Sequence, residues 1–163
     1  MKVALLNLAK FDSLNLRTNE PISLTYLQSM LRKKGYYADI YDLSRYPQKD
    51  ISSVIRSISN GYQIIGISVY YPNNPKDIIK LIKKYNINTK IILGGPYVTL
   101  ADEIFLKNNP EVDIIVRGEG EYTIVELMDY FESKVGLENV KGISYIKNGQ
   151  FHRNNARGII SDL

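Results

Sequence analysis

The chain has 163 residues, a formal net charge of +4, no cysteine and a single histidine, His152. This length suits one domain with a sizeable core. The composition excludes disulfides, thiolate catalysis, cysteine-ligated clusters and multi-histidine metal sites within this chain. No apolar run approaches the ~18 residues of a membrane span, and the N-terminus lacks a signal-peptide core, so we expect a cytoplasmic protein without membrane contact. The lysines are scattered over predicted helix surfaces, which indicates a solvated face rather than a nucleic-acid partner.

Short apolar runs alternate with amphipathic stretches along the chain. Aliphatic residues at helical spacing, such as Leu24, Leu27 and Leu31, predict helices that cover a buried sheet. Gly35 and Gly61 are expected to end two of these helices. Strands are predicted at residues 3–6, 36–41, 64–69, 91–93 and 113–116, and helices at residues 21–34, 50–60, 75–85, 104–107 and 122–132.

This alternation predicts an α/β fold: a flavodoxin-like or Rossmann-like doubly wound parallel sheet of about five strands. The expected strand order is 2-1-3-4-5. Residues 143–152, with an Asn148-Gly149 turn, predict a β-hairpin appended to the edge of the sheet. We accordingly expect residues 1–141 to form the main domain, and residues 142–163 to form the hairpin and the start of a linker.

The fourth predicted strand ends in a pair of glycines, and the residues in order are Gly94, Gly95, Pro96, Tyr97, Val98 and Thr99. Glycine takes backbone angles that other residues avoid and leaves no side chain in the way. Ligands of open α/β sheets bind outside the carboxyl ends of the strands. We therefore expect a ligand to approach the backbone at Gly94 and Gly95. The alternative is that the pair only makes a tight turn into the next helix.

Two further loops follow strands of the same sheet. Ser68 ends the third strand with a hydroxyl group, and Tyr70 and Tyr71 offer flat apolar faces suited to a large ring. The alternatives are a hydroxyl bonded to nearby backbone and an ordinary turn rich in asparagine and proline. Residues 7–20 form an unusually long loop after the first strand, and loops of this length are often functional.

The loop after the fifth strand alternates glycine and glutamate. Gly118, Glu119, Gly120 and Glu121 lead into the last predicted helix. A carboxylate near a helix N-terminus is stabilising by up to ~1 kcal/mol, which explains the acids without any ligand. It does not explain the glycine on each side of Glu119, which indicates a close approach or a sharp bend of the backbone.

Several catalytic and nucleotide-binding patterns are missing from the sequence. The first loop has no glycine-rich dinucleotide fingerprint, and the chain has no Walker phosphate loop. Asp12 and Asp42 do not form the acidic cluster of a phospho-receiver domain. We find no nucleophile–base pair and no catalytic carboxylate pair, so we expect that this chain does not catalyse a reaction by itself.

Several motifs resemble those of one family, in the same order along the chain. They are the helix of residues 21–35, Ile65-Gly66-Ile67-Ser68, the Gly94–Thr99 turn, Val116-Arg117-Gly118-Glu119-Gly120-Glu121, and Gly142-Ile143-Ser144-Tyr145 before the hairpin turn. The family is the N-terminal cobalamin-binding domain of cobalamin-dependent radical S-adenosylmethionine (SAM) enzymes. The resemblance covers essentially the whole chain.

The resemblance implies that the chain holds cobalamin with its nucleotide tail pulled out from under the corrin. The tail would lie in a groove between the sheet and the helices. Ser68 would contact the base of the tail, and Gly94 and Gly95 would leave room for the tail. Thr99 would add a polar contact. The turn would be shaped by Pro96, Tyr97 and Val98, the corrin would face Val69, Tyr70 and Tyr71, and the neighbouring edge would be lined by Gly118, Glu119, Gly120 and Glu121.

Two features depart from related patterns. Methionine-synthase-type cobalamin domains carry an Asp-x-His-x-x-Gly loop whose histidine ligates cobalt, whereas residues 7–13 contain no histidine. That ligation is therefore not expected here. Tyr97 stands where the family often has histidine, and we expect His152 in the hairpin to lie at the surface rather than on cobalt.

We expect this chain to be the cofactor-carrying part of a longer parent enzyme. The family's Cys-x-x-x-Cys-x-x-Cys motif would follow Leu163, so the parent would use SAM and an iron–sulfur cluster in a radical SAM domain that is this domain's partner. Its activity would be methyl transfer or a related radical reaction. Two alternatives stay open. One is a cobalamin-free relative with a structural or substrate-recognition role, its pocket filled by Tyr70, Tyr71 and Tyr97, and the other is a flavodoxin-like binder of a nucleotide or flavin.

Overall fold

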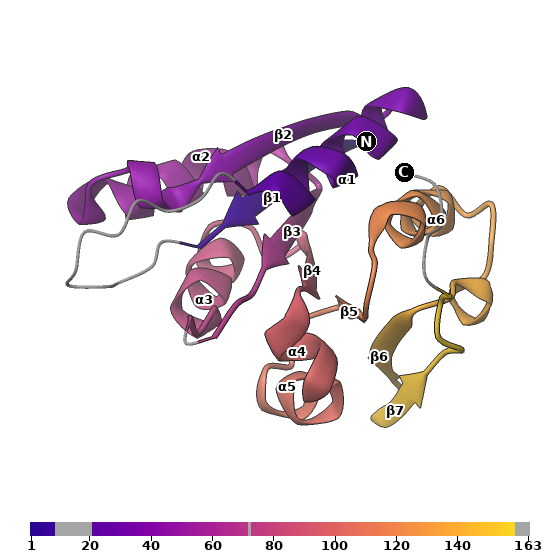
Figure 1. Ribbon diagram of the computed structural model, residues 1–163. Coiled ribbons are helices and arrows are strands. Elements are labelled where there is room, and N and C mark those ends of the chain that lie inside the picture. Colours follow the sequence, from indigo (N-terminus) through magenta and orange to yellow (C-terminus); the bar gives the residue numbers. More distant parts are fainter. Residues whose placement is uncertain (9–20, 72, 159–163) are drawn as a thin grey trace.

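In the computed structural model, which describes residues 1–8, 21–71 and 73–158, seven strands form one sheet in the order β2-β1-β3-β4-β5-β6-β7. The β5–β6 and β6–β7 pairs are antiparallel, and the other pairs are parallel. The predicted strand order is therefore confirmed, and the predicted hairpin extends the sheet beyond β5 (Figure 1). The strands are β1 (Lys2–Asn7), β2 (Tyr37–Asp42), β3 (Ile64–Ser68), β4 (Lys90–Gly94), β5 (Ile114–Val116), β6 (Ile143–Lys147) and β7 (Gln150–Arg153).

Helices cover both faces of the sheet (Figure 1). One face carries α1 and α6, and the other carries α2, α3, α4 and α5. None of these helices has the length and apolar character that a bilayer span requires, within the described residues. The helices are α1 (Ile22–Lys33), α2 (Ile51–Gly61), α3 (Lys76–Tyr85), α4 (Pro96–Leu100), α5 (Asp102–Asn108) and α6 (Glu121–Phe131), with short 3₁₀ turns at Leu43–Arg45, Gln48–Asp50 and Leu137–Asn139.

Strand register aligns the residues that lie beneath α1 and α6. Successive side chains of a strand point to opposite faces of the sheet, so residues that pair across parallel strands share a face. Leu5 pairs with Gly66, and Gly66 pairs with Ile92. In the next row of the same face, Ser68 pairs with Gly94. This face therefore carries two glycines, side by side with aliphatic residues, near the carboxyl ends of the central strands.

The structure differs from the sequence-based expectation at one turn. Residues 96–99 were expected as a turn, but they begin the short helix α4, because Pro96 at its first position has a φ angle that suits a helix start. The next helix, α5, begins at Asp102 rather than at Ile104. Of the long loop of residues 7–20, only Asn7 and Leu8 are described, so Asp12 lies outside the described residues.

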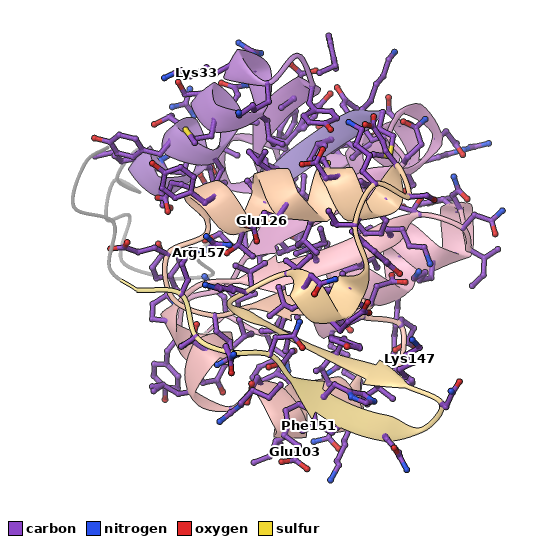
Figure 2. The ribbon with its side chains drawn as sticks, turned by 90° about the vertical axis from the view of Figure 1, so that its right-hand side faces the viewer. Lys33, Glu103, Glu126, Lys147, Phe151 and Arg157 are labelled. Atoms are coloured by element: carbon purple, nitrogen blue, oxygen red, sulfur yellow. The ribbon has the colours of Figure 1, made fainter. Side chains whose placement is uncertain are left out.

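A buried carboxylate fastens the hairpin to α5. Asp102 is 1% exposed and accepts hydrogen bonds from Ser144 Oγ at 2.5 Å and from Arg153 Nε at 3.0 Å. The Nε atom of Arg117 lies 3.6 Å from Asp102 Oδ2. A second contact ties the C-terminal segment to α6, where Arg157 Nη2 donates to Glu126 Oε2 at 2.5 Å (Figure 2). The hydrogen bonds and ion pairs of Asp102 thus attach the hairpin to α5.

Low pH is expected to weaken the interactions of Asp102 with Ser144 and Arg153. Burial alone would raise the pKa of Asp102, but hydrogen bonds from Arg153 and Ser144 outweigh burial and hold its pKa below the usual value. A depressed pKa contributes stability that is fully present above the unfolded value of ~3.9 and is lost as pH falls through the folded value. Urea unfolding from pH 6 down to pH 3 should show the stability gap between wild type and Asp102→Asn narrowing below about pH 4. A gap that stays constant to pH 3 would contradict the ion-pair assignment.

Candidate functional site

A cavity of about 500 Å³ lies between the sheet and helices α1 and α6, at the carboxyl ends of the central strands. Most of its lining is apolar, contributed by β1, β3, β4, β5 and the two helices. The cavity volume falls within the range of small-molecule sites, about 300–1,000 Å³. Of the residues predicted from the sequence, those that line it are Ser68, Tyr70, Gly94, Gly95, Pro96, Thr99, Gly118, Glu119, Gly120 and Glu121.

The surface of the sheet forms the floor of the cavity, and two glycines of the strands place no side chain on it. A Cβ atom on Gly94 would meet only the carbonyl oxygen of Val116, at 3.9 Å, so its side-chain direction is open. A Cβ atom on Gly66 would touch Leu5 Cδ2 at 3.0 Å. Between them, the aliphatic side chain of Ile92 completes the floor. A side chain larger than hydrogen at Gly94 would therefore take up cavity space rather than disturb the packing.

Gly95 is a glycine for a different reason. Its φ angle is +107°, a conformation that L side chains rarely adopt, and a Cβ atom there would lie 2.5 Å from the carbonyl oxygen of Val69. The N–H of Val69 donates to the carbonyl of Gly94 at 2.8 Å, which holds the two loops together. Gly95 lines the cavity, but its missing side chain is required by the backbone of the neighbouring loop.

Helices α1 and α6 form the apolar wall opposite the floor. Leu24 and Leu27 of α1 line the cavity, and so does Ile124 of α6. The two helices approach closely at Gly120, where an added Cβ atom would lie 3.3 Å from Leu27 Cδ2. The glycine before α6 therefore lets the helices close over the sheet. Floor and wall together make a slot with aliphatic surfaces on both sides, suited to a flat ring.

A few polar groups lie in this apolar lining. Ser68 is 7% exposed, and its hydroxyl makes no hydrogen bond with the described part of the chain. The hydroxyls of Ser23 and Tyr70 lie 3.5 Å apart at the rim. Thr99 Oγ1 donates to the carbonyl of Gly95 at 2.9 Å and accepts from the N–H of Gly118 at 3.4 Å. Thr99 therefore joins two of the loops, while Ser68 keeps a hydroxyl available to a ligand.

The charged groups of the lining are both acidic. Glu119 and Glu121 line the cavity, whereas no lysine, arginine or histidine of the described residues does. Glu121 is 9% exposed, and its Oε2 atom makes no hydrogen bond. The site consequently offers a ligand a hydrogen-bond acceptor at Glu121.

Four residues predicted for the site do not line the cavity. Val69 and Val98 are fully buried in the core on the opposite face of the sheet. Tyr97 packs edge-on against Phe105 and Tyr71, with ring centroids 5.3 Å and 5.6 Å away. Tyr71 is 76% exposed. Of the three tyrosines expected to fill the pocket in the cobalamin-free alternative, two therefore lie outside it, and Tyr70 lies at its rim.

His152 lies away from the cavity. It is on β7, and its ring stacks on that of Tyr145 with a centroid distance of 5.1 Å. His152 is half-buried there, and it is the only histidine of the sequence. Within the described residues, no group of three or more histidine, cysteine, aspartate or glutamate side chains could hold a metal ion.

Sequence reasoning missed the residues that the helices and mid-strand positions contribute. Leu24 and Leu27 were interpreted only as part of an amphipathic core stripe, and no local pattern separates a cavity wall from a core. Gly66 gave a usable signal, because a glycine inside a buried, β-branched strand often marks a close approach by a ligand or another backbone.

A family model and several known proteins match this chain. The model of the B12 binding domain matches residues 17–128. An uncharacterized methyltransferase of Pyrococcus horikoshii is 32% identical over 151 residues, which are 90% of this chain and 32% of that protein. The chain thus spans about a third of the length of this curated relative.

Two solved structures show the same architecture. The cobalamin-dependent SAM radical enzyme OxsB, with aqua-cobalamin and SAM bound, superposes with a TM-score of 0.85 at 26% identity, over 97% of this chain and 22% of that chain. The radical SAM methyltransferase TsrM of Kitasatospora setae, with cobalamin and a [4Fe-4S] cluster bound, gives a TM-score of 0.81 over 99% of this chain and 30% of that chain, and its 16% identity shows the fold alone. On the match to its family model, this chain belongs to the B12-binding domain family and resembles the cobalamin domains of radical SAM methyltransferases.

Proposed function

We propose that this domain holds cobalamin with its nucleotide tail inside the cavity and its corrin over the mouth. The observation that carries the proposal is the open, aliphatic slot above the bare floor of Gly66 and Gly94. A flat aromatic base buries its faces well between such surfaces. When bound, cobalamin would supply cobalt-centred chemistry, and the chain would bind and orient it.

The remaining lining residues fit the two ends of such a ligand. Ser68 would donate its hydroxyl hydrogen to the acceptor nitrogen of the tail's base. At the mouth, Tyr70 is 41% exposed and Leu100 is 87% exposed, so both offer apolar surface to the corrin. The sole histidine of the chain, His152, stacks on Tyr145 away from the cavity, so no imidazole of this chain would be expected to hold the cobalt.

The sequence disfavours the flavin or nucleotide alternative. Such ligands are commonly held by a phosphate-binding loop after a strand, and the chain has neither the dinucleotide fingerprint in its first loop nor a Walker phosphate loop. The open cavity likewise weighs against the cobalamin-free alternative, since Tyr71 and Tyr97 do not occupy it.

For the longer protein, we propose a radical SAM enzyme that transfers a methyl group or performs a related radical reaction. The OxsB and TsrM structures contain SAM or an iron–sulfur cluster besides cobalamin, and this chain spans 22% and 30% of their chains. A radical SAM domain would then be the partner that faces the mouth of the cavity.

A retention experiment tests cobalamin binding. The purified chain is mixed with hydroxocobalamin, desalted, and examined by visible absorption and circular dichroism. We expect about one corrin per chain to be retained, because the cavity and the apolar rim bury a large part of the ligand. A well-folded chain that retains no corrin absorbance would contradict the proposal and favour the cobalamin-free alternative.

A further inference from the structure

One carboxylate oxygen inside the cavity has no partner. Glu121 is the first residue of α6, is 9% exposed and lines the cavity, and its Oε2 atom makes no hydrogen bond. An ionised carboxylate can only accept hydrogen bonds. A buried acceptor without a donor is costly, more so when it is charged. The site therefore lacks a hydrogen-bond donor at this position.

In the described part of the chain, the arginine side chains near Glu121 interact with other groups. Arg117 faces Asp102 and donates to the carbonyl of Ile143 at 3.2 Å. Arg157 donates to Thr123 Oγ1 at 2.9 Å and pairs with Glu126. None of these cations lines the cavity. The donor that Glu121 lacks is therefore expected from a ligand.

We infer that Glu121 accepts a hydrogen bond from a sugar hydroxyl of the cobalamin tail, an assignment that rests on the proposed function. The benzimidazole base of the tail has an acceptor nitrogen and no N–H donor, so it suits the hydroxyl of Ser68 and not a carboxylate. The sugar next to the base carries free hydroxyls, which are donors. Ser68 on β3 thus contacts the base of the tail, and Glu121 on α6 contacts its sugar.

This assignment makes Glu121 a specificity residue for the tail. A hydrogen bond to a charged acceptor is stronger than one between neutral groups. A site that presents a buried acceptor rejects an analogue without the matching donor. Glu121 should therefore favour complete cobalamin over cobinamide, the corrinoid that lacks the nucleotide.

Equilibrium dialysis against hydroxocobalamin and diaquacobinamide tests this assignment. Glu121→Ala should weaken binding of hydroxocobalamin at least about tenfold, which corresponds to about 1.4 kcal/mol, and should leave binding of cobinamide unchanged. Glu121→Gln should weaken hydroxocobalamin binding less than Glu121→Ala does, because its amide oxygen still accepts a hydrogen bond, although without the charge. The matched control is Glu103→Gln, a first-turn glutamate of α5 that does not line the cavity and that lies well away from α6 in Figure 2.

Three outcomes would overturn the assignment. An equal loss of both corrinoids in Glu121→Ala would mean a general effect on the structure, and a loss below about twofold for hydroxocobalamin would mean that the carboxylate has no partner on the tail. A wild-type chain that binds cobinamide as tightly as cobalamin would mean that the tail does not enter the cavity. If wild type binds neither corrinoid, the proposed function fails first, and this result is distinct from a failure of Glu121 alone.

Discussion

Gly94→Leu is expected to abolish cobalamin retention while the domain stays folded. The backbone at Gly94 has no positive φ angle, and an added Cβ atom would meet only the Val116 carbonyl oxygen at 3.9 Å. The leucine side chain would extend from the floor into the slot next to Ser68, its partner in the sheet register. Because core-like sites tolerate little excess volume, the base of the tail would be excluded. Retention of hydroxocobalamin after desalting measures the effect, and we expect the retained corrin per chain to fall below about a tenth of the wild-type value.

Two other glycine substitutions distinguish a blocked cavity from an unfolded domain. Gly61→Leu is the matched control, because Gly61 ends α2 away from the cavity and an added Cβ atom would meet nothing within 4 Å. It should retain cobalamin as wild type does. Gly95→Ala should instead disturb the fold, since its Cβ atom would lie 2.5 Å from the Val69 carbonyl oxygen. Full retention by a folded Gly94→Leu chain would show that the tail does not pass over this floor.

Asp102→Asn is expected to destabilise the domain by about 3 kcal/mol, the lower end of the range for breaking a buried ion pair. The carboxylate is 1% exposed. It accepts a hydrogen bond from Ser144 and forms ion pairs with Arg153 and Arg117. The side chain of Arg117 is 13% exposed, and its Nε atom makes no hydrogen bond. Without the Asp102 charge, the guanidinium would stay buried and uncompensated, and α5 would lose its fastening to the hairpin.

Urea unfolding at pH 7 measures this loss. Glu103→Gln is again the control, because its pair with Lys107 is exposed and such surface pairs contribute about 0–1 kcal/mol. Asp102→Asn should retain cobalamin under native conditions, since Asp102 does not line the cavity. A stability within about 0.5 kcal/mol of wild type would show that the hairpin packs independently of these charges.

The strand order and the loops of the site were predictable from local patterns. Short apolar runs between amphipathic helices specify a doubly wound sheet, and the carboxyl ends of its strands meet at one edge. That reasoning brought Ser68 and Gly94 to one ligand, and the family resemblance added Gly120. All three line the cavity. The hairpin at the edge was predictable from Asn148-Gly149, where both residues have positive φ angles.

The direction of individual side chains was less predictable. Val69 directly follows Ser68, yet it packs in the core on the opposite face, because successive residues of extended backbone point to opposite sides. Tyr97 turns toward Phe105 because α4 is a helix rather than a turn. Leu24 and Leu27 could not be assigned to a cavity, since the gap above the sheet depends on how closely α1 approaches α6. This approach is a property of tertiary packing that no single segment encodes.

The tail of bound cobalamin is expected to leave cobalt and enter the slot above Gly66 and Gly94. Electron paramagnetic resonance of cob(II)alamin bound to the chain reads this directly, because an axial nitrogen nucleus splits each cobalt line into three. We predict a spectrum without this threefold splitting, since on the proposed function the base would lie in the cavity, and His152, the sole histidine of the chain, stacks on Tyr145. A bound spectrum that keeps the threefold splitting would show a nitrogen still on cobalt and would contradict the assignment of the cavity to the tail.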